Sequence, residues 1–125
     1  MKVNFKFSMV YEELLTEMSR RKPTRKDLNE VYSFTKDFEK LWRRKEKKII
    51  NSIEKNSGLK FKEETIKCYF VNHMLYKGIS DPLTLRIGEV LEDMEIALIH
   101  ELIHRLFENN KARIKETIFK KYPEE

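Results

Sequence analysis

The amino-acid sequence predicts an α+β fold, a single small domain in which long helices pack on a small β-sheet. Its 125 residues suit one hydrophobic core, so we expect one domain spanning residues 1–125. Long segments carry apolar residues at helical spacing, whereas short segments alternate apolar and polar residues as strands do. Apolar residues make up 40% of the chain, and three Gly and three Pro are few enough to exclude a disordered chain.

The first third of the chain is predicted to hold a strand, a helix and the start of a long helix. Residues 2–7 alternate polar and apolar side chains, which favours a short strand or an extended arm. Residues 9–20 have a helical pattern, which Pro23 interrupts. Thr24, with Asp27 three positions later, then provides an N-cap and an acidic first turn, so a long helix should follow.

The long helix should place the lone Trp42 in the core and end near Gly58, because glycine suits a helix C-cap. Residues 65–71 then change to a period of two, which predicts a strand. Turn-forming residues fill 76–82, and residues 83–87 alternate again. We therefore expect a second strand after this turn.

A further helix is predicted from about residue 89 to about residue 108. Its first turns are acidic, as the helix dipole favours, and its middle is apolar. Asn109 and Asn110 give a turn, and residues 111–121 suit one more helix. Residues 122–125 should end the chain as a polar tail.

The single cysteine, Cys68, excludes an internal disulfide and a cysteine-ligated metal site. No window approaches the roughly 18 consecutive apolar residues of a membrane span. The first residues also alternate charged and apolar side chains, unlike a signal peptide. We therefore expect a cytoplasmic protein with no membrane partner.

The net charge of +5 comes partly from two basic runs, at residues 20–22 and 43–48. Such runs can bind the phosphates of nucleic acids. Acidic residues are interleaved throughout the chain, and this favours solvated helix faces instead. A nucleic-acid partner is therefore not expected.

Residues 100–104 read His-Glu-Leu-Ile-His, an HExxH motif inside the predicted helix. Residues four apart share a helix face, so His100 and His104 can direct both imidazoles at one Zn²⁺. Glu101 lies about 100° around the helix, where its carboxylate can reach a metal-bound water. Zinc lowers the pKa of that water toward about 7, so Glu101 would act as general base and later as proton donor in peptide hydrolysis.

Chance gives an HExxH motif in a shuffled chain of this composition on the order of once in a hundred. Two of the three histidines belong to the motif, and helical periodicity is predicted there independently. The alternative interpretation is a pair of ordinary helix histidines with Glu101 exposed. An intact zinc site that has lost activity is a second alternative.

Zinc needs a third protein ligand. The longer HExxHxxGxxH motif is absent, because Phe107 and Asn110 occupy its last two positions. If the next helix folded back antiparallel after the turn, Glu116 would return to the level of His104, since both lie about 9 Å from Asn110. The alternative for Glu116 is a solvent-facing ion pair with Lys120.

Other residues were candidates for supporting roles. His73 could be a ligand or could stabilise the oxyanion, and Tyr76 or Tyr122 could donate a hydrogen bond to the tetrahedral intermediate. A peptide substrate would lie along an exposed strand edge, which either residues 65–71 or residues 83–87 could supply. The sequence leaves these choices open.

The HELIH motif, a strand upstream of it and a Glu on the following helix resemble the gluzincins, zinc metallopeptidases with two His ligands and one Glu ligand. The small size is most similar to the soluble minigluzincins. This resemblance implies zinc on His100, His104 and Glu116, with Glu101 as the catalytic base. Many gluzincins carry an Asp four residues after the ligand Glu, but that position here is Lys120.

Small members of this group can be latent, and the acidic tail suggests a means. We expect residues 122–125 to be able to fold back on the site and inhibit it. Competing hypotheses are a basic helical nucleic-acid-binding protein and a catalytically silent, zinc-stabilised scaffold. The substrate would be a peptide or protein, and self-association stays open.

Overall fold

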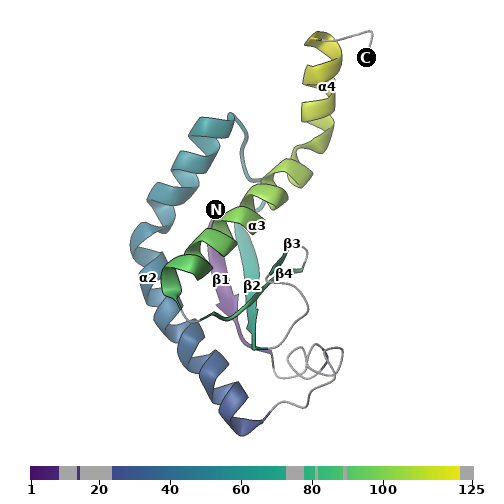
Figure 1. Cartoon of the computed structure of the whole chain (residues 1–125). Coiled ribbons are helices and arrows are strands. Elements are labelled where there is room, and N and C mark those ends of the chain that lie inside the picture. Colours follow the sequence, from purple (N-terminus) through teal and green to yellow (C-terminus); the bar gives the residue numbers. More distant parts are fainter. Residues whose placement is uncertain (9–13, 15–23, 73–77, 81, 89, 122–125) are drawn as a thin grey trace.

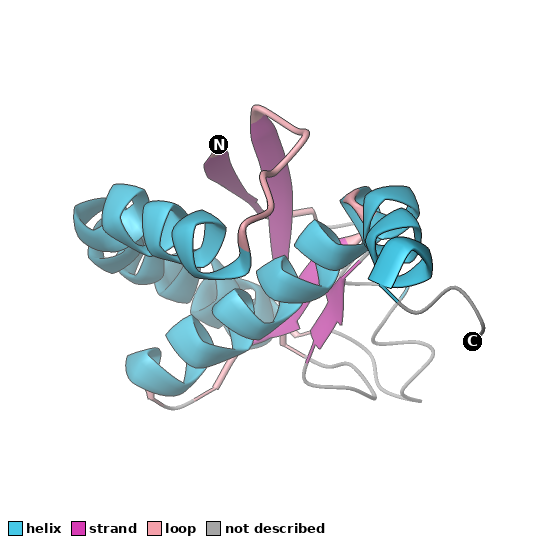
Figure 2. Ribbon diagram, turned by 90° about the horizontal axis from the view of Figure 1, so that it is seen from above, coloured by secondary structure: helices cyan, strands magenta, loops and turns pink. Residues whose placement is uncertain are grey.

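The computed structural model contains four strands and three labelled helices and describes residues 1–8, 14, 24–72, 78–80, 82–88 and 90–121. The strands are β1 (Lys2–Lys6), β2 (Thr65–Val71), β3 (Gly78–Ser80) and β4 (Leu83–Arg86). The helices are α2 (Arg25–Ser57), α3 (Leu91–Asn109) and α4 (Lys111–Lys121). Helices α2 and α3 cover one face of the sheet, whereas α4 projects from the body (Figures 1 and 2). The predicted α+β fold is confirmed; the helix expected at residues 9–20 lies almost wholly outside the described residues.

Helix α2 begins and ends where its capping residues predict. The Thr24 hydroxyl accepts a hydrogen bond from the Asp27 amide at 3.1 Å, and the Asp27 carboxylate accepts one from the Thr24 amide at 3.0 Å. This reciprocal pair satisfies amides that have no partner within the helix. At the other end Gly58 adopts the left-handed conformation, with φ 70°. Glycine adopts this conformation without the steric cost that a β-carbon would add.

The sheet has the strand order β1-β2-β4-β3. Strands β1 and β2 pair in parallel, as do β2 and β4, whereas β3 runs antiparallel to β4. The strand β3 was not expected, because its residues lie in a segment rich in turn-forming residues. Within the described sheet both β2 and β4 are interior, and β3 and β1 form the two edges.

One core lies between the sheet and helices α2 and α3. Phe38 of α2 makes edge-to-face contacts with two rings of the sheet. The centroid distances are 5.2 Å to Phe70 of β2 and 5.4 Å to Phe5 of β1. Trp42 is fully buried next to Phe38, as predicted. Burying each such ring contributes about 1.5–3 kcal/mol. Cys68 is also fully buried, and burial raises the pKa of its thiol, which therefore stays neutral.

A buried carboxylate closes the β1 edge of the sheet. Glu46 is 8% exposed, and its Oε2 atom accepts hydrogen bonds from the Val3 amide (3.0 Å), the Trp42 indole (2.6 Å) and Arg43 (2.8 Å). Arg43 in turn donates to the Val3 carbonyl. Both main-chain groups of Val3 are thus bonded to α2, so this point of the edge cannot pair with a further strand.

Helix α3 packs on the sheet through a row of leucines. The buried residues recur every fourth position, which places them on one face: Met94, Leu98, Leu102 and Leu106. Residues two positions away from these leucines must face outward. Within the described part of the chain, no helix is long and apolar enough to span a membrane.

Candidate active site

The outward face of α3 carries the two histidines of the HExxH motif. Leu98 and Leu102 are fully buried, so His100, midway between them, and His104, one turn further on, face solvent. Their Nε2 atoms lie 3.1 Å apart and their ring planes meet at 78°. Imidazole binds a metal through an unprotonated ring nitrogen, so two Nε2 atoms that face each other are placed to share one ion.

This geometry fits two corners of a zinc site. Two ligands that each lie about 2.0–2.1 Å from Zn²⁺ in a tetrahedral arrangement are roughly 3.3 Å apart. The observed 3.1 Å separation requires only a small adjustment of the two rings. The donor set and spacing therefore suit zinc or a similar divalent ion at this position.

Glu101 lies between α3 and the edge strand β3. Its side chain is half-buried and packs against Gly78: a β-carbon at position 78 would lie 3.2 Å from Cγ and 3.3 Å from Oε1 of Glu101. The same β-carbon would lie 2.9 Å from Leu85 Cδ2. Gly78 thus lets β3 approach the helix, and this role was not identified from the sequence. The turn-forming residues around Gly78 indicated a loop, so the local sequence contained no signal for this role.

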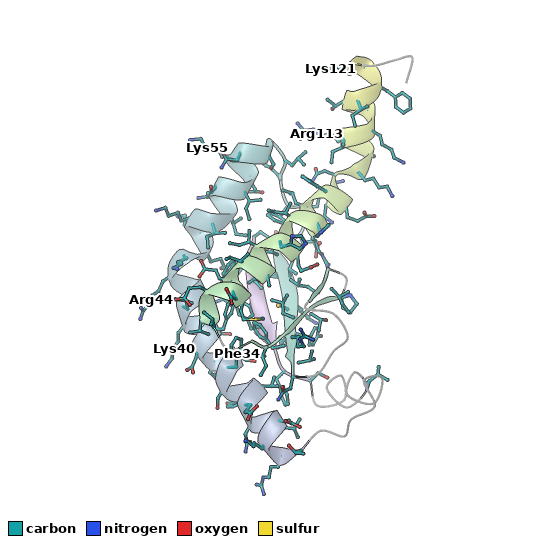
Figure 3. The ribbon with its side chains drawn as sticks, viewed as in Figure 1. Phe34, Lys40, Arg44, Lys55, Arg113 and Lys121 are labelled. Atoms are coloured by element: carbon teal, nitrogen blue, oxygen red, sulfur yellow. The ribbon has the colours of Figure 1, made fainter. Side chains whose placement is uncertain are left out.

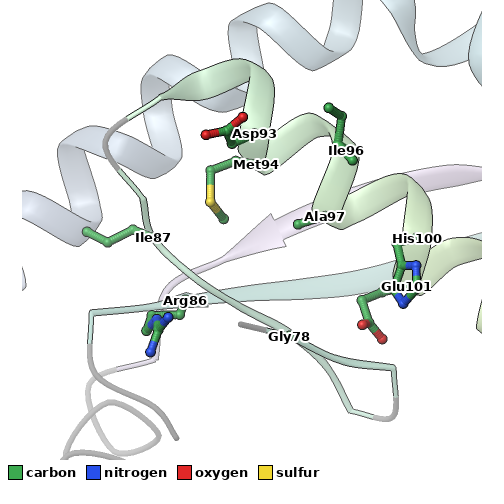
Figure 4. A pocket seen from close by; sticks show the side chains of 9 residues that line it. All are labelled: Gly78, Arg86, Ile87, Asp93, Met94, Ile96, Ala97, His100 and Glu101. Atoms are coloured by element: carbon green, nitrogen blue, oxygen red, sulfur yellow. The ribbon is translucent and has the colours of Figure 1, made fainter. Parts of the chain in front are cut away.

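A cavity of about 640 Å³ opens beside His100 and Glu101 (Figure 4). It lies between the start of α3 and the β3–β4 strands. Apolar side chains supply much of its wall, with Arg86 and Asp93 as the charged residues besides Glu101: Gly78, Arg86, Ile87, Asp93, Met94, Ile96, Ala97, His100 and Glu101. Its size lies in the range of protein ligand pockets.

The strand edge nearest Glu101 belongs to β3. The prediction of an exposed edge at residues 83–87 is wrong, because β4 lies between β2 and β3. Strand β2 pairs with β4 over Tyr69–Val71, so in the described sheet the side of residues 65–68 that faces away from β1 has no strand partner. The opposite edge of the sheet, at β1, is bonded to Glu46 and Arg43 of α2. The edge strand that contacts Glu101 is β3, through Gly78.

Helix α4 does not fold back along α3 (Figure 1). A single residue, Asn110, joins the two helices, and an antiparallel pair needs a longer connection of about 2–5 residues. Asn110 is buried, and its side-chain amide donates to the carbonyls of Leu106 (2.8 Å) and Lys60 (3.0 Å). The Asn110 carbonyl accepts from the Ile114 amide at 2.9 Å, so the chain enters α4 at once.

The structure brings His100, Glu101 and His104 together but leaves Glu116 apart. Glu116 forms an ion pair with Lys120 at 3.7 Å, and its side chain is 70% exposed. This ion pair is the alternative role that the i,i+4 spacing of Glu116 and Lys120 suggested. In the parts of the chain that are described, no cluster of three or more His, Cys, Asp or Glu is arranged to hold a metal. The antiparallel return that led to Glu116 is not present in this arrangement.

Several predicted residues cannot be located. His73, Tyr76 and Tyr122 lie outside the described residues, as does the tail at 122–125. Their expected roles stay predictions.

The connection after α2 is fastened to α3 next to His104. Arg105 donates two hydrogen bonds to the Glu63 carboxylate, each 2.9 Å long. The hydrogen bond and charge of Arg105, with a further hydrogen bond from Asn109, hold the pKa of Glu63 below its usual value despite partial burial. This ion pair ties the connection after α2 to the C-terminal half of α3, the half that carries His104.

The basic run on α2 is partly used in structural contacts. Arg43 binds Glu46 and Val3, and Lys45 pairs with Glu95 of α3 at 3.2 Å. Lys40 and Arg44 project from the helix into solvent (Figure 3). The basic residues at 20–22 lie outside the described residues. Within the run at residues 43–48, two basic side chains thus have acidic partners, whereas Arg44, Lys47 and Lys48 are exposed.

Comparisons with known proteins found no match, so a function can be proposed only from the residues of the site. No family model matches the chain, and no curated protein or solved structure matches it either.

Proposed function

We propose that the protein is a zinc-dependent metallopeptidase, in which His100 and His104 bind the metal and Glu101 is the catalytic base. The observation that carries this proposal is the convergence of the two Nε2 atoms at 3.1 Å on the face of α3 that also adjoins Glu101. Zinc bound there would act as a Lewis acid and lower the pKa of water. The fold has the expected α+β class, and the specific support for this function comes from the site residues.

The position of Glu101 suits proton transfer. Its carboxylate shares a cavity with His100 and lies beside the edge strand β3. A peptide lying along that edge would bring its carbonyl to the same cavity, where Glu101 can take a proton from the attacking water and give it to the leaving amine. The half-buried setting restricts the carboxylate to orientations that face the cavity.

The third metal ligand requires a change in α4 if Glu116 supplies it. The direction of α4 is set by the buried Asn110 side chain, which donates hydrogen bonds to the carbonyls of Leu106 and Lys60. Metal binding by Glu116 would require these bonds to break. Among the described residues, the present arrangement therefore offers His100 and His104 as metal ligands, and the role of Glu116 stays a prediction.

Metal analysis and peptide digestion test the proposal together. Purified full-length protein should bind one equivalent of zinc, and the paired variant His100→Ala with His104→Ala should bind none. Glu101→Gln should keep the zinc and lose the cleavage of a mixed peptide library. A wild-type chain that takes up no zinc, or a Glu101→Gln variant that cleaves as fast as wild type, would exclude this function.

A silent zinc scaffold is the second candidate. It is favoured by the absence of a third ligand among the described residues near the histidine pair. This candidate predicts stoichiometric zinc, a higher melting temperature with zinc, and no cleavage of the library by any variant. Nucleic-acid binding is less well supported, because Arg43 and Lys45 already have acidic partners.

A further inference from the structure

A second cavity adjoins the histidine pair on the side away from Glu101. It is a groove of about 860 Å³ between the end of α2, the second half of α3 and the face of α4. His104 lines it, whereas His100 lines the first cavity. The remaining lining residues are Ser57, Gly58, Leu59, Phe107, Glu108, Lys111, Arg113, Ile114, Lys115, Thr117 and Ile118. We name this surface the α4 groove.

The floor of the α4 groove is apolar and open to water. Phe107 is 49% exposed and Ile118 is 52% exposed, and Leu59 and Ile114 are only partly covered. Ile103 and Phe107 continue this apolar surface into a neighbouring hollow against the last turns of α2. Clustered apolar side chains that remain in water are typical of a binding surface, because burying them is favourable.

The rim of the α4 groove is basic. Lys111, Arg113 and Lys115 give three positive charges against one negative charge from Glu108, a local excess of two. Lys111 and Lys115 are one helical turn apart, so both ammonium groups extend from the same face of α4. An occupant that is both apolar and acidic would match this floor and rim.

We propose that the α4 groove docks an apolar and acidic segment of the peptide substrate, on the opposite side of the histidine pair from the cavity at Glu101. The inference rests on the proposed function. A chain that crosses the pair would leave one cavity at His100 and enter the other at His104. The substrate class is therefore a peptide with aliphatic or aromatic residues next to Asp or Glu.

Other occupants fit less well. A second copy docked by the same surface would bring two basic rims together, which is unfavourable. A nucleic acid would find an aliphatic floor with Phe107 as the aromatic residue among those lining the groove, and Glu108 would repel its phosphates. The charge and the apolar floor together favour the acidic peptide.

The experiment measures binding without turnover, on full-length Glu101→Gln protein. The probes are two labelled short peptides, one alternating Glu with Leu and the other alternating Gln with Leu, followed by fluorescence polarisation. The acidic peptide should bind at least about tenfold more tightly, and added salt should weaken it. The paired variant Lys111→Glu with Lys115→Glu should weaken its binding about tenfold, whereas Lys47→Glu on the exposed face of α2 should have little effect.

Ile118→Ser tests the apolar floor and should weaken both peptides. Equal binding of the two peptides, or unchanged binding in the paired lysine variant, would overturn the proposal. So would a dimer in light scattering that Ile118→Ser dissolves, or a single-stranded RNA that displaces the acidic peptide. Zinc content and library cleavage of the lysine variant are measured separately. The docking proposal can therefore be disproved while the metallopeptidase proposal holds, and the metallopeptidase proposal can be disproved by the zinc and cleavage measurements alone.

Discussion

Glu101 packs its side chain against Gly78, in a contact that joins the centre of α3 to the edge strand β3. A β-carbon at position 78 would lie closer than van der Waals contact to side-chain atoms of both Glu101 and Leu85, so these side chains or the strand would have to shift. This contact sets where the carboxylate points and how close the strand edge lies to it.

Gly78→Ala should reduce kcat/KM about ten- to hundredfold while zinc stays bound, because it displaces the carboxylate or the strand by a fraction of an ångström. The measurement is library cleavage combined with zinc content. The matched control is Gly88→Ala, whose β-carbon would meet the flexible side chain of Met94 at 3.2 Å. Equal activity losses in the two variants would argue against a specific role for Gly78.

Glu101→Gln should lower kcat at least about hundredfold, because the amide cannot accept the proton of the attacking water. Zinc affinity, measured by isothermal titration calorimetry, should remain within a fewfold of wild type, since Glu101 is not a ligand in our proposal. A parallel loss of zinc and activity would show that this side chain holds the metal instead.

Glu116→Ala should weaken zinc binding at least about hundredfold if α4 delivers the third ligand. The stability of the metal-free protein should not change, because the side chain is 70% exposed. Lys120→Ala is the matched control, since it removes the same ion pair and leaves the carboxylate. If both variants bind zinc as tightly as wild type, Glu116 is not a ligand and the third donor must be sought elsewhere.

Glu46→Ala should destabilise the fold by about 2–4 kcal/mol. The substitution leaves the Val3 amide and the Trp42 indole without their acceptor and leaves Arg43 without its partner in a mostly buried setting. Urea unfolding followed by Trp42 fluorescence measures the change. Asp37→Ala, on an exposed position of the same helix, should cost much less.

Glu63→Gln should destabilise the protein at neutral pH by about 1 kcal/mol or less, because the pair with Arg105 is partly exposed. The folded-state pKa of Glu63 is lowered from 4.5, so its contribution is present above that value and is lost as pH falls through the folded pKa. Wild type and variant should therefore differ at pH 7 and converge once the pH falls below the lowered pKa of Glu63. A difference that persists in acid would point to packing rather than charge.

The local features of the chain could be predicted from its sequence. Capping residues located both ends of α2, and alternation located β2, because these signals act over a few residues. The His100–His104 spacing similarly needs only a continuous helix.

Long-range arrangement could not be predicted in the same way. The position of β2 and β4 inside the sheet depends on which strands pair, and sequence alternation does not specify the pairing. The direction of α4 depends on one buried side chain, Asn110, whose hydrogen bond to Lys60 holds a junction too short for a reversal. Counting residues from a turn was therefore insufficient to place Glu116.

The parallel pairing of β1 with β2 affects how the chain can assemble. Lys2 lies opposite Thr65, so on the ribosome β1 is made several seconds before the strand that it needs, at roughly 5–20 residues per second. Glu46 and Arg43 emerge earlier than β2 and already offer bonds to Val3. Helix α2 can therefore hold the first strand by its outer edge during synthesis, which leaves the opposite edge open for β2.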